Sequence, residues 1–283
     1  MNESAALFGV RLVVAYDGTA FCGFQLQNQQ RTVQGDLEYA LAQMAGHPVR
    51  LRAAGRTDSG VHALGQVVAF DSARSIRARG WMLGLHAHLP EDIRVQSAAS
   101  CAVGYNPRFD SAGKIYRYLI QTGEAKNPLL RNRAWQLGNP ALPDVARMRA
   151  AAEQLVGTHD YRAFRQADDA RENSVRTLFR VEVREGIAGD PSLIAIEVHG
   201  TAFMKNMVRI LAGTLTDVGM GRIAPERVPR MLGPTALREW TGQTAPAQGL
   251  TLVEVKLGRH AKGGPLAHGH GGELGDLTPG VTD

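Results

Sequence analysis

Cysteine is scarce in this chain of 283 residues, which contains only Cys22 and Cys101. Two cysteines cannot form a disulfide framework or a cysteine-rich zinc site, and they fit a reducing compartment. Long apolar runs are also missing, since nowhere do 18 apolar residues follow one another. The first residues include an acidic side chain and lack a basic start before an apolar stretch. These absences argue against secretion and against a membrane span, so we expect a cytoplasmic protein.

Lysine is scarce beside arginine, because only five of the 32 basic residues are lysines. The net charge is nevertheless +5, which predicts an anionic partner. Arginine suits bidentate contacts with phosphate and stacking on bases. One short segment combines arginines with flat rings, a mixture typical of RNA-binding surfaces. Its members are Tyr161, Arg162, Phe164, Arg165, Arg171, Arg176, Phe179 and Arg180.

The first part of the chain shows an ordered series of strand and helix patterns. Apolar residues alternate over residues 10–16, and helical spacing follows from Thr32, a plausible N-cap, to Met44. Further patterns predict strands over 49–54 and 66–70, a helix over 76–86 and a strand over 93–99. The predicted order is βαββαβ.

The same order is predicted a second time after Arg108. The elements are a strand over 114–121, a helix over 145–156, strands over 177–184 and 193–199, a helix over 204–218 and a strand over 250–255. This order predicts an α+β protein of two ferredoxin-like halves, residues 1–107 and 108–257. We expect one continuous, mostly antiparallel sheet with helices on one face and the active-site cleft on the other. Residues 258–283 are rich in glycine and predicted to be a disordered tail.

A polar loop between two predicted strands of the first half carries the strongest chemical signal. Residues 53–63 read AAGRTDSGVHA and place Arg56, Asp58 and His62 close together. The glycine spacing resembles a P-loop, but Val61 and His62 stand where lysine and a hydroxyl must be, so nucleotide hydrolysis is excluded. An aspartic protease would need a second carboxylate, which only a symmetric dimer could supply. The histidines and cysteines form no convincing metal site. We expect Asp58 to be ionised, because a neighbouring cation favours the charged form, and to act as nucleophile or base.

The chain resembles the bacterial tRNA pseudouridine synthase A family, whose active-site loop reads GRTD followed by GVH. The similarity covers about residues 8–257. Its further motifs, in chain order, are Tyr16-Asp17-Gly18, Gly23-Phe24-Gln25, Thr32-Val33-Gln34, Gly65-Gln66-Val67-Val68, Arg108-Phe109, KIYRY at 114–118, Phe164-Arg165, FMKNMVR at 203–209 and Gly249-Leu250.

The resemblance implies isomerisation of uridine to pseudouridine in the anticodon stem-loop of tRNA, at positions 38 to 40 in tRNA numbering. It also implies a homodimer that uses neither a metal nor an organic cofactor. By the same resemblance, Asp58 is the catalytic aspartate, and Arg56 is its ion-pair partner and helps to hold the flipped nucleotide. Tyr116 is then the tyrosine that packs on the target uracil and can transfer a proton.

Other residues are expected to bind the substrate. Arg165 and the pair Lys205 and Arg209, one helical turn apart, are predicted to contact tRNA phosphates, while Arg209 could instead support the active site from within. Leu250 is expected to line the site, although apolar packing explains it equally well.

A nonenzymatic RNA-binding protein remains the alternative, because βαββαβ is also the order of a common RNA-recognition module. That module carries stacking aromatics in its third strand, a signature that residues 66–70 and 193–197 do not fit. The sequence therefore favours the enzyme.

Overall fold

The strands of the described residues form one large sheet. The structure is a computed structural model that describes residues 7–138, 142–169 and 172–258, so the predicted tail lies almost entirely outside the described residues. The sheet has ten strands, with the main order β4-β1-β3-β10-β5-β9-β8-β7. They are β1 (Phe8–Tyr16), β2 (Arg52–Ala53), β3 (His62–Ser72), β4 (Ile93–Cys101), β5 (Ser111–Gln121), β6 (Trp135–Gln136), β7 (Gly157–Asp160), β8 (Val175–Glu185), β9 (Leu193–Gly200) and β10 (Leu250–Leu257).

Both halves show the same strand pairing, which confirms the predicted fold class. In the first half β1 lies between β4 and β3, and β2 pairs with β3. In the second half β5 lies between β10 and β9, and β8 pairs with β9. These pairs are antiparallel, as expected for two ferredoxin-like units.

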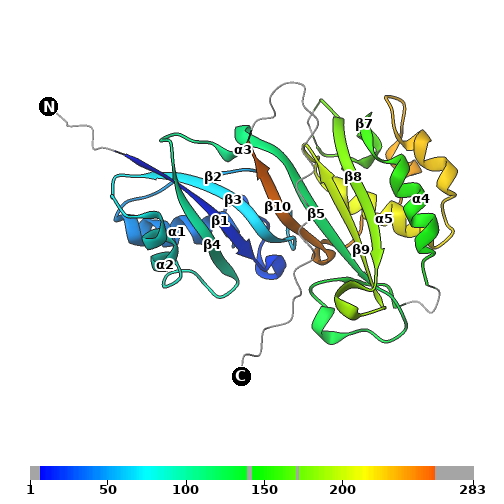
Figure 1. The fold of residues 1–283 in the computed structure, drawn as a ribbon, viewed down its shortest axis with the longest axis horizontal. Coiled ribbons are helices and arrows are strands. Elements are labelled where there is room, and N and C mark those ends of the chain that lie inside the picture. The colour runs from blue at the N-terminus through cyan, green and yellow to red at the C-terminus, as the bar shows by residue number, and fades with distance from the viewer. Residues whose placement is uncertain (1–6, 139–141, 170–171, 259–283) are drawn as a thin grey trace.

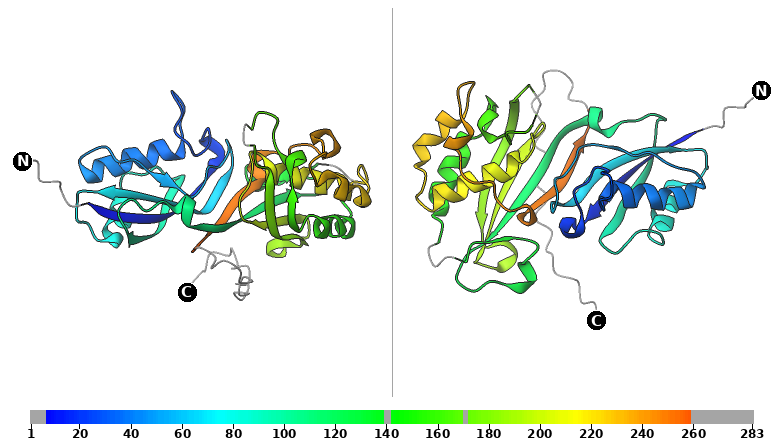
Figure 2. Two further views of the ribbon diagram at one scale, coloured as in Figure 1. Left: turned by 90° about the horizontal axis from the view of Figure 1, so that it is seen from above. Right: turned by 180° about the vertical axis from the view of Figure 1, so that it is seen from behind.

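The described residues form five α-helices. They are α1 (Val33–Ala45), α2 (Ala78–Leu85), α3 (Pro107–Asp110), α4 (Val145–Gln154) and α5 (Met207–Gly219). The long helices α1 and α5 lie behind the strands in Figure 1 and in front of them in the reverse view of Figure 2. The predicted boundary after residue 107 falls inside α3, which links β4 to β5. That the halves are separate folding units stays a prediction.

Local sequence explains how α1 begins and ends. The Thr32 side chain accepts a hydrogen bond from the Gly35 amide at 3.2 Å, which satisfies one of the free donors at the helix N-terminus. Gly46 ends the helix in the left-handed region, with φ of 75°. One face of α1 packs against the sheet through Val33, Leu37 and Leu41, which are fully buried.

Helix α5 is buried on nearly all sides, because the segment before β10 wraps its outer face. A Cβ atom on Gly213 would lie 1.8 Å from the Gln243 carbonyl oxygen, so only glycine permits this approach. In the first half, Trp81 of α2 is fully buried and packs edge-on against Phe70, with ring centroids 5.0 Å apart.

The last strand of the chain joins the two halves. β10 pairs with β5 in antiparallel fashion and with β3 in parallel, where Thr251 lies beside His62 and Leu252 beside Ala63. In Figure 1 this junction lies at the centre of the molecule. The start of β3, which follows the polar loop, is therefore held next to the second half.

The described residues contain no helix that is both long enough and apolar enough to cross a membrane.

Candidate active site

The polar loop between β2 and β3 is fastened along its length to the segment that follows β1. The Phe24 amide donates to the Thr57 carbonyl at 3.0 Å, and the hydroxyls of Tyr16 and Thr57 share a hydrogen bond of 2.7 Å. The Ser59 hydroxyl donates to the Phe21 carbonyl at 3.2 Å. Asp58 therefore lies between two anchored neighbours, which limits the positions that its carboxylate can take.

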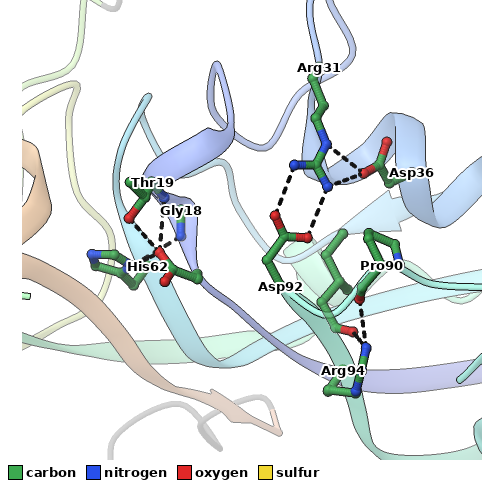
Figure 3. A network of polar contacts seen from close by, with 10 residues as sticks. Gly18, Thr19, Arg31, Asp36, His62, Pro90, Asp92 and Arg94 are labelled. Atoms are coloured by element: carbon green, nitrogen blue, oxygen red, sulfur yellow. Dashed lines mark hydrogen bonds and ion pairs between the residues drawn. The ribbon is translucent and has the colours of Figure 1, made fainter. Parts of the chain in front are cut away.

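The segment that anchors the loop is itself held by Arg31 (Figure 3). Its guanidinium makes two hydrogen bonds of 2.9 Å to Asp92 and an ion pair of 3.0 Å to Asp36. The same guanidinium lies 4.2 Å from the centre of the Phe21 ring. Residues from three separate stretches of the first half thus fix the segment on which Asp58 depends.

His62 fastens the other end of the loop to the second half. Its Nδ1 accepts from the Gly18 amide at 3.0 Å (Figure 3). Its Nε2 donates to the Gln248 carbonyl at 3.1 Å. Burial lowers the pKa of His62, although the carboxylate of Asp17 opposes that effect. The neutral ring with its proton on Nε2 is the form that makes both hydrogen bonds. Arg133 adds an ion pair of 2.8 Å with Asp17, and so a second link between the halves.

Tyr116 enters the site from β5. Its Cα is paired with Leu252 of β10, one strand away from the start of β3. The side chain is 7% exposed and packs edge-on against Phe203, with ring centroids 5.1 Å apart. Burial raises the pKa of Tyr116, and the charge of Asp58 raises it further, because the hydroxyl lies within electrostatic reach of that carboxylate. Tyr116 is therefore neutral at physiological pH.

Two cations of the second half lie within electrostatic reach of the same carboxylate. Burial lowers the pKa of Arg209, and the charge of Asp58 opposes this shift. The Arg209 side chain is half-buried and donates to the Ala245 carbonyl and to the Asn206 side chain, each at 2.7 Å. A hydrogen bond to Asp168 raises the pKa of Lys205, and Asp58 contributes to the same direction. The fold thus brings Asp58, Tyr116, Lys205 and Arg209 together from distant parts of the chain.

Arg56 and Asp58 do not form an ion pair in the described structure. Arg56 is exposed, whereas Asp58 is half-buried, so the two side chains meet different surroundings although they are two residues apart. The ion pair implied by the resemblance is therefore not made here. Leu250 is 5% exposed and is the first residue of β10, where it pairs with Tyr118 of β5. It therefore lies on the strand between β3 and β5.

The basic segment around residues 162–180 is largely neutralised by the protein itself. Arg162 pairs with Asp160 at 2.8 Å, and Arg180 pairs with Glu197 at 2.7 Å. Lys205 pairs with Asp168 at 2.7 Å. Arg165 is half-buried and also has partners within the protein. An RNA phosphate would have to displace a carboxylate at each of these ion pairs.

Sequence analysis placed His62 in the polar loop without giving it a role, and it did not identify Tyr16 as part of the site. Burial raises the pKa of Tyr16 to about 12, while hydrogen bonds from Thr57 and Gln66 oppose that rise. Its signal in the sequence was a tyrosine at the end of a strand followed by Asp17-Gly18. A buried tyrosine more often belongs to a core, so this signal is too weak to use without the fold.

Among the described residues, no group of three or more histidine, cysteine, aspartate or glutamate side chains is placed to hold a metal ion. Two cavities among the described residues lie away from the loop. One, of about 370 Å³, is lined by residues of α1 and of the segment after α2, and the other, of about 230 Å³, by Arg227, Arg230, Met231 and Trp240.

The fold and site define a duplicated α+β protein that holds the Asp58 carboxylate on an anchored loop where its halves meet. Comparison with known proteins identifies the family to which the sequence is similar. A sequence model described as tRNA pseudouridine synthase matches residues 12–110 and 151–256. A tRNA pseudouridine synthase A of Geotalea uraniireducens is 45% identical over 246 residues, which are 87% of this chain and 98% of that protein. One of Geobacter sulfurreducens is 44% identical over 88% of this chain and 99% of its own length.

A further relative of the same name, from Myxococcus xanthus, is 41% identical over 93% of this chain and 96% of its own length. The regions that match the sequence model include the loop, α5 and most of β10, whereas β5, which carries Tyr116, lies in the gap between them. The chain belongs to the tRNA pseudouridine synthase family, which is a family of isomerases.

Proposed function

We propose that this protein isomerises uridine to pseudouridine in tRNA and that Asp58 is its catalytic carboxylate. The observation that supports this most is the placement of Asp58 on an anchored loop, within electrostatic reach of Tyr116, Lys205 and Arg209. One carboxylate in a partly desolvated, preorganised site is what nucleophilic or general-base catalysis requires.

The reaction needs no oxidation and no external group. The bond between C1′ and N1 of uridine breaks, the uracil turns, and a new bond forms between C1′ and C5. The C5 proton leaves and N1 gains a proton, so the atoms of substrate and product balance. Asp58 serves as the nucleophile or base, and Arg209 lies within electrostatic reach of it. Tyr116 is neutral and can pack against uracil and exchange a proton with it.

The target nucleotide must leave its stack before Asp58 can reach it, which costs a few kcal/mol. Arg56 is exposed on the loop and is the residue proposed to hold the flipped nucleotide. Arg165 and Lys205 are proposed to contact tRNA phosphates, and Leu250 to line the pocket. We place the modified uridines at positions 38 to 40 of the anticodon stem-loop, and we expect a homodimer. Cys22 and Cys101 are free thiols, which fits a cytoplasmic enzyme.

The direct test is modification of an unmodified tRNA transcript by the purified protein. Carbodiimide labelling followed by primer extension would map pseudouridine to single nucleotides. We expect stops at positions 38 to 40 and at no uridine outside the anticodon stem-loop. Stops elsewhere would contradict the assigned target. A protein that binds the transcript but never modifies it would instead be the nonenzymatic RNA-binding protein.

A further inference from the structure

Lys114 is a half-buried cation beside the catalytic loop, and its ammonium group has no ion-pair or hydrogen-bond partner among the residues that the structure describes. It lies on β5, two residues before Tyr116. Across the described residues, no carboxylate forms an ion pair with it and no acceptor takes a hydrogen bond from it. The nearest acidic residue in sequence, Asp110, accepts instead from the Tyr105 hydroxyl at 2.7 Å. The other lysines described on strands or near α5 behave differently, since Lys205 and Lys256 each have a carboxylate at 2.7 Å.

The loop packs directly on this side chain. A Cβ atom on Gly55 would lie 3.0 Å from Cε and 3.4 Å from Nζ of Lys114. The ammonium group therefore lies against the backbone of the residue that precedes Arg56. A larger residue in place of Gly55 would push the lysine away from the loop, and glycine keeps the two in contact.

The strand geometry places Lys114 on the same face as Tyr116. The pairing of β5 with β9 is regular from Lys114 to Gln121, so alternate side chains point to the same side. Two residues along a strand span about 7 Å. One face of β5 thus presents a cation beside the tyrosine that is proposed to contact uracil.

A second cation faces Lys114 from α3. Burial lowers the pKa of Lys114, and the charge of Arg108 lowers it further, so the two cations lie within electrostatic reach of each other. Arg108 is exposed, and so is Arg56, which follows Gly55 in the chain. A desolvated cation near other cations is unfavourable unless an anion joins them.

We propose that Lys114, supported by Arg108, binds a backbone phosphate next to the target uridine and so positions the nucleotide over Asp58. The ligand class is a phosphodiester of the RNA substrate. Lys114 is a positioning residue here, because it contacts the chain that carries the uridine and not the reacting atoms. This inference rests on the proposed function for the identity of the RNA.

The test is a titration with anticodon stem-loop RNA over several salt concentrations. The variants are Lys114→Gln, Lys114→Arg and, as a matched control, Lys256→Gln on the neighbouring strand. We expect Lys114→Gln to weaken binding about tenfold and to lower the slope of log affinity against log salt by about 0.7. Lys114→Arg should restore most of both, and Lys256→Gln should change neither. Equal affinity and slope for wild type and Lys114→Gln would overturn the inference.

Replacing one phosphate of the RNA at a time with an uncharged methylphosphonate identifies which phosphate Lys114 contacts. RNAs that carry one methylphosphonate at a time, on either side of the target uridine, would be titrated with wild type and Lys114→Gln. At one position, the methylphosphonate should weaken RNA binding by the wild-type protein by the same factor as Lys114→Gln does. The same methylphosphonate should not weaken RNA binding by the Lys114→Gln variant any further. Additive losses at every position would overturn the inference. RNA should also protect Lys114 of the wild-type protein from acetylation by acetic anhydride, a measurement that needs no variant.

These outcomes separate the two proposals. If wild type modifies tRNA while Lys114→Gln binds and reacts like wild type, only the phosphate contact fails. If binding depends on Lys114 as described but no pseudouridine forms, the phosphate contact stands and the proposed function fails.

Discussion

The hydroxyls of Tyr16 and Thr57 lie 2.7 Å apart and join the end of β1 to the residue before Asp58. Both side chains are buried, with 4% and 6% of their surface exposed, so water cannot replace either partner. The position of the candidate catalytic carboxylate thus depends on a strand more than 40 residues earlier in the chain.

Replacing Tyr16 with phenylalanine should loosen the loop and slow turnover. Tyr16→Phe leaves the Thr57 hydroxyl buried without this partner, which costs about 1 to 3 kcal/mol. Tyr161→Phe is the matched control, since its hydroxyl donates to the Leu155 carbonyl at 2.6 Å in the second half. We expect urea unfolding to show a similar loss for both variants and only Tyr16→Phe to lose activity. Equal activity of the two variants would show that this bond does not position Asp58.

Gly23 and Gly104 both have positive φ, but only Gly23 lies against the catalytic loop. Substituting each with alanine therefore distinguishes the effect of backbone strain from the effect of disturbing the loop. A Cβ atom on Gly23, at φ of 93°, would lie 2.9 Å from the Thr57 carbonyl oxygen. Gly104, at φ of 76°, has open space around it. Gly104→Ala should cost about 1 to 2 kcal/mol of stability and leave turnover unchanged. Gly23→Ala should cost more and also reduce turnover. The comparison would fail if Gly23→Ala reacted at the wild-type rate.

His62 should make the protein less stable on acidification. Burial holds the pKa of His62 below its ordinary value of 6.5, so the unfolded chain binds more protons as the pH falls through that value. The free energy of unfolding should therefore fall between about pH 7.5 and 5.5. His62→Gln keeps a donor and an acceptor but cannot titrate, so its stability should fall less over that range. His199 titrates in both proteins and does not affect the difference. Parallel curves would contradict a buried neutral His62.

The ion pair between Lys205 and Asp168 gives opposite predictions for its two members. Lys205→Ala should weaken tRNA binding, because the ammonium group is proposed to contact a phosphate. Arg165, the other proposed phosphate contact, gives a parallel prediction: Arg165→Ala should lower the slope of log affinity against log salt by roughly one. Asp168→Asn should strengthen binding a few-fold, because it frees Lys205 and removes a repelling charge. Titration at two salt concentrations measures all three variants. Weaker binding by Asp168→Asn would remove Lys205 from the proposed RNA surface.

The repeated βαββαβ order could be predicted from sequence, because alternation and helical spacing are local signals. Tertiary pairing set several boundaries that local patterns missed. The strand predicted over 49–54 forms only at Arg52–Ala53, whereas β3 begins at His62, four residues before its predicted start, since β10 pairs with it there. The last predicted helix begins at Met207 and not at residue 204, because Asn206 adopts a left-handed conformation with φ of 58°.

The candidate site was only partly visible in the sequence. Asp58 and Arg56 share a short motif, and the resemblance added Tyr116. The sequence could not show that Arg162 and Arg180 are neutralised by Asp160 and Glu197, because those ion pairs depend on strand register and on a turn. Nor could it show that Lys114 contacts Gly55, since that contact joins the two halves of the fold.

The most direct measurement is pseudouridine formation by Asp58→Asn with tRNA affinity determined in parallel. Asparagine nearly preserves the size of the side chain and removes its charge. The account predicts no detectable pseudouridine in the anticodon stem-loop and an affinity within about tenfold of wild type, a difference of about 1.4 kcal/mol. Modification by Asp58→Asn at the wild-type rate would show that Asp58 is only a turn residue and would contradict the account.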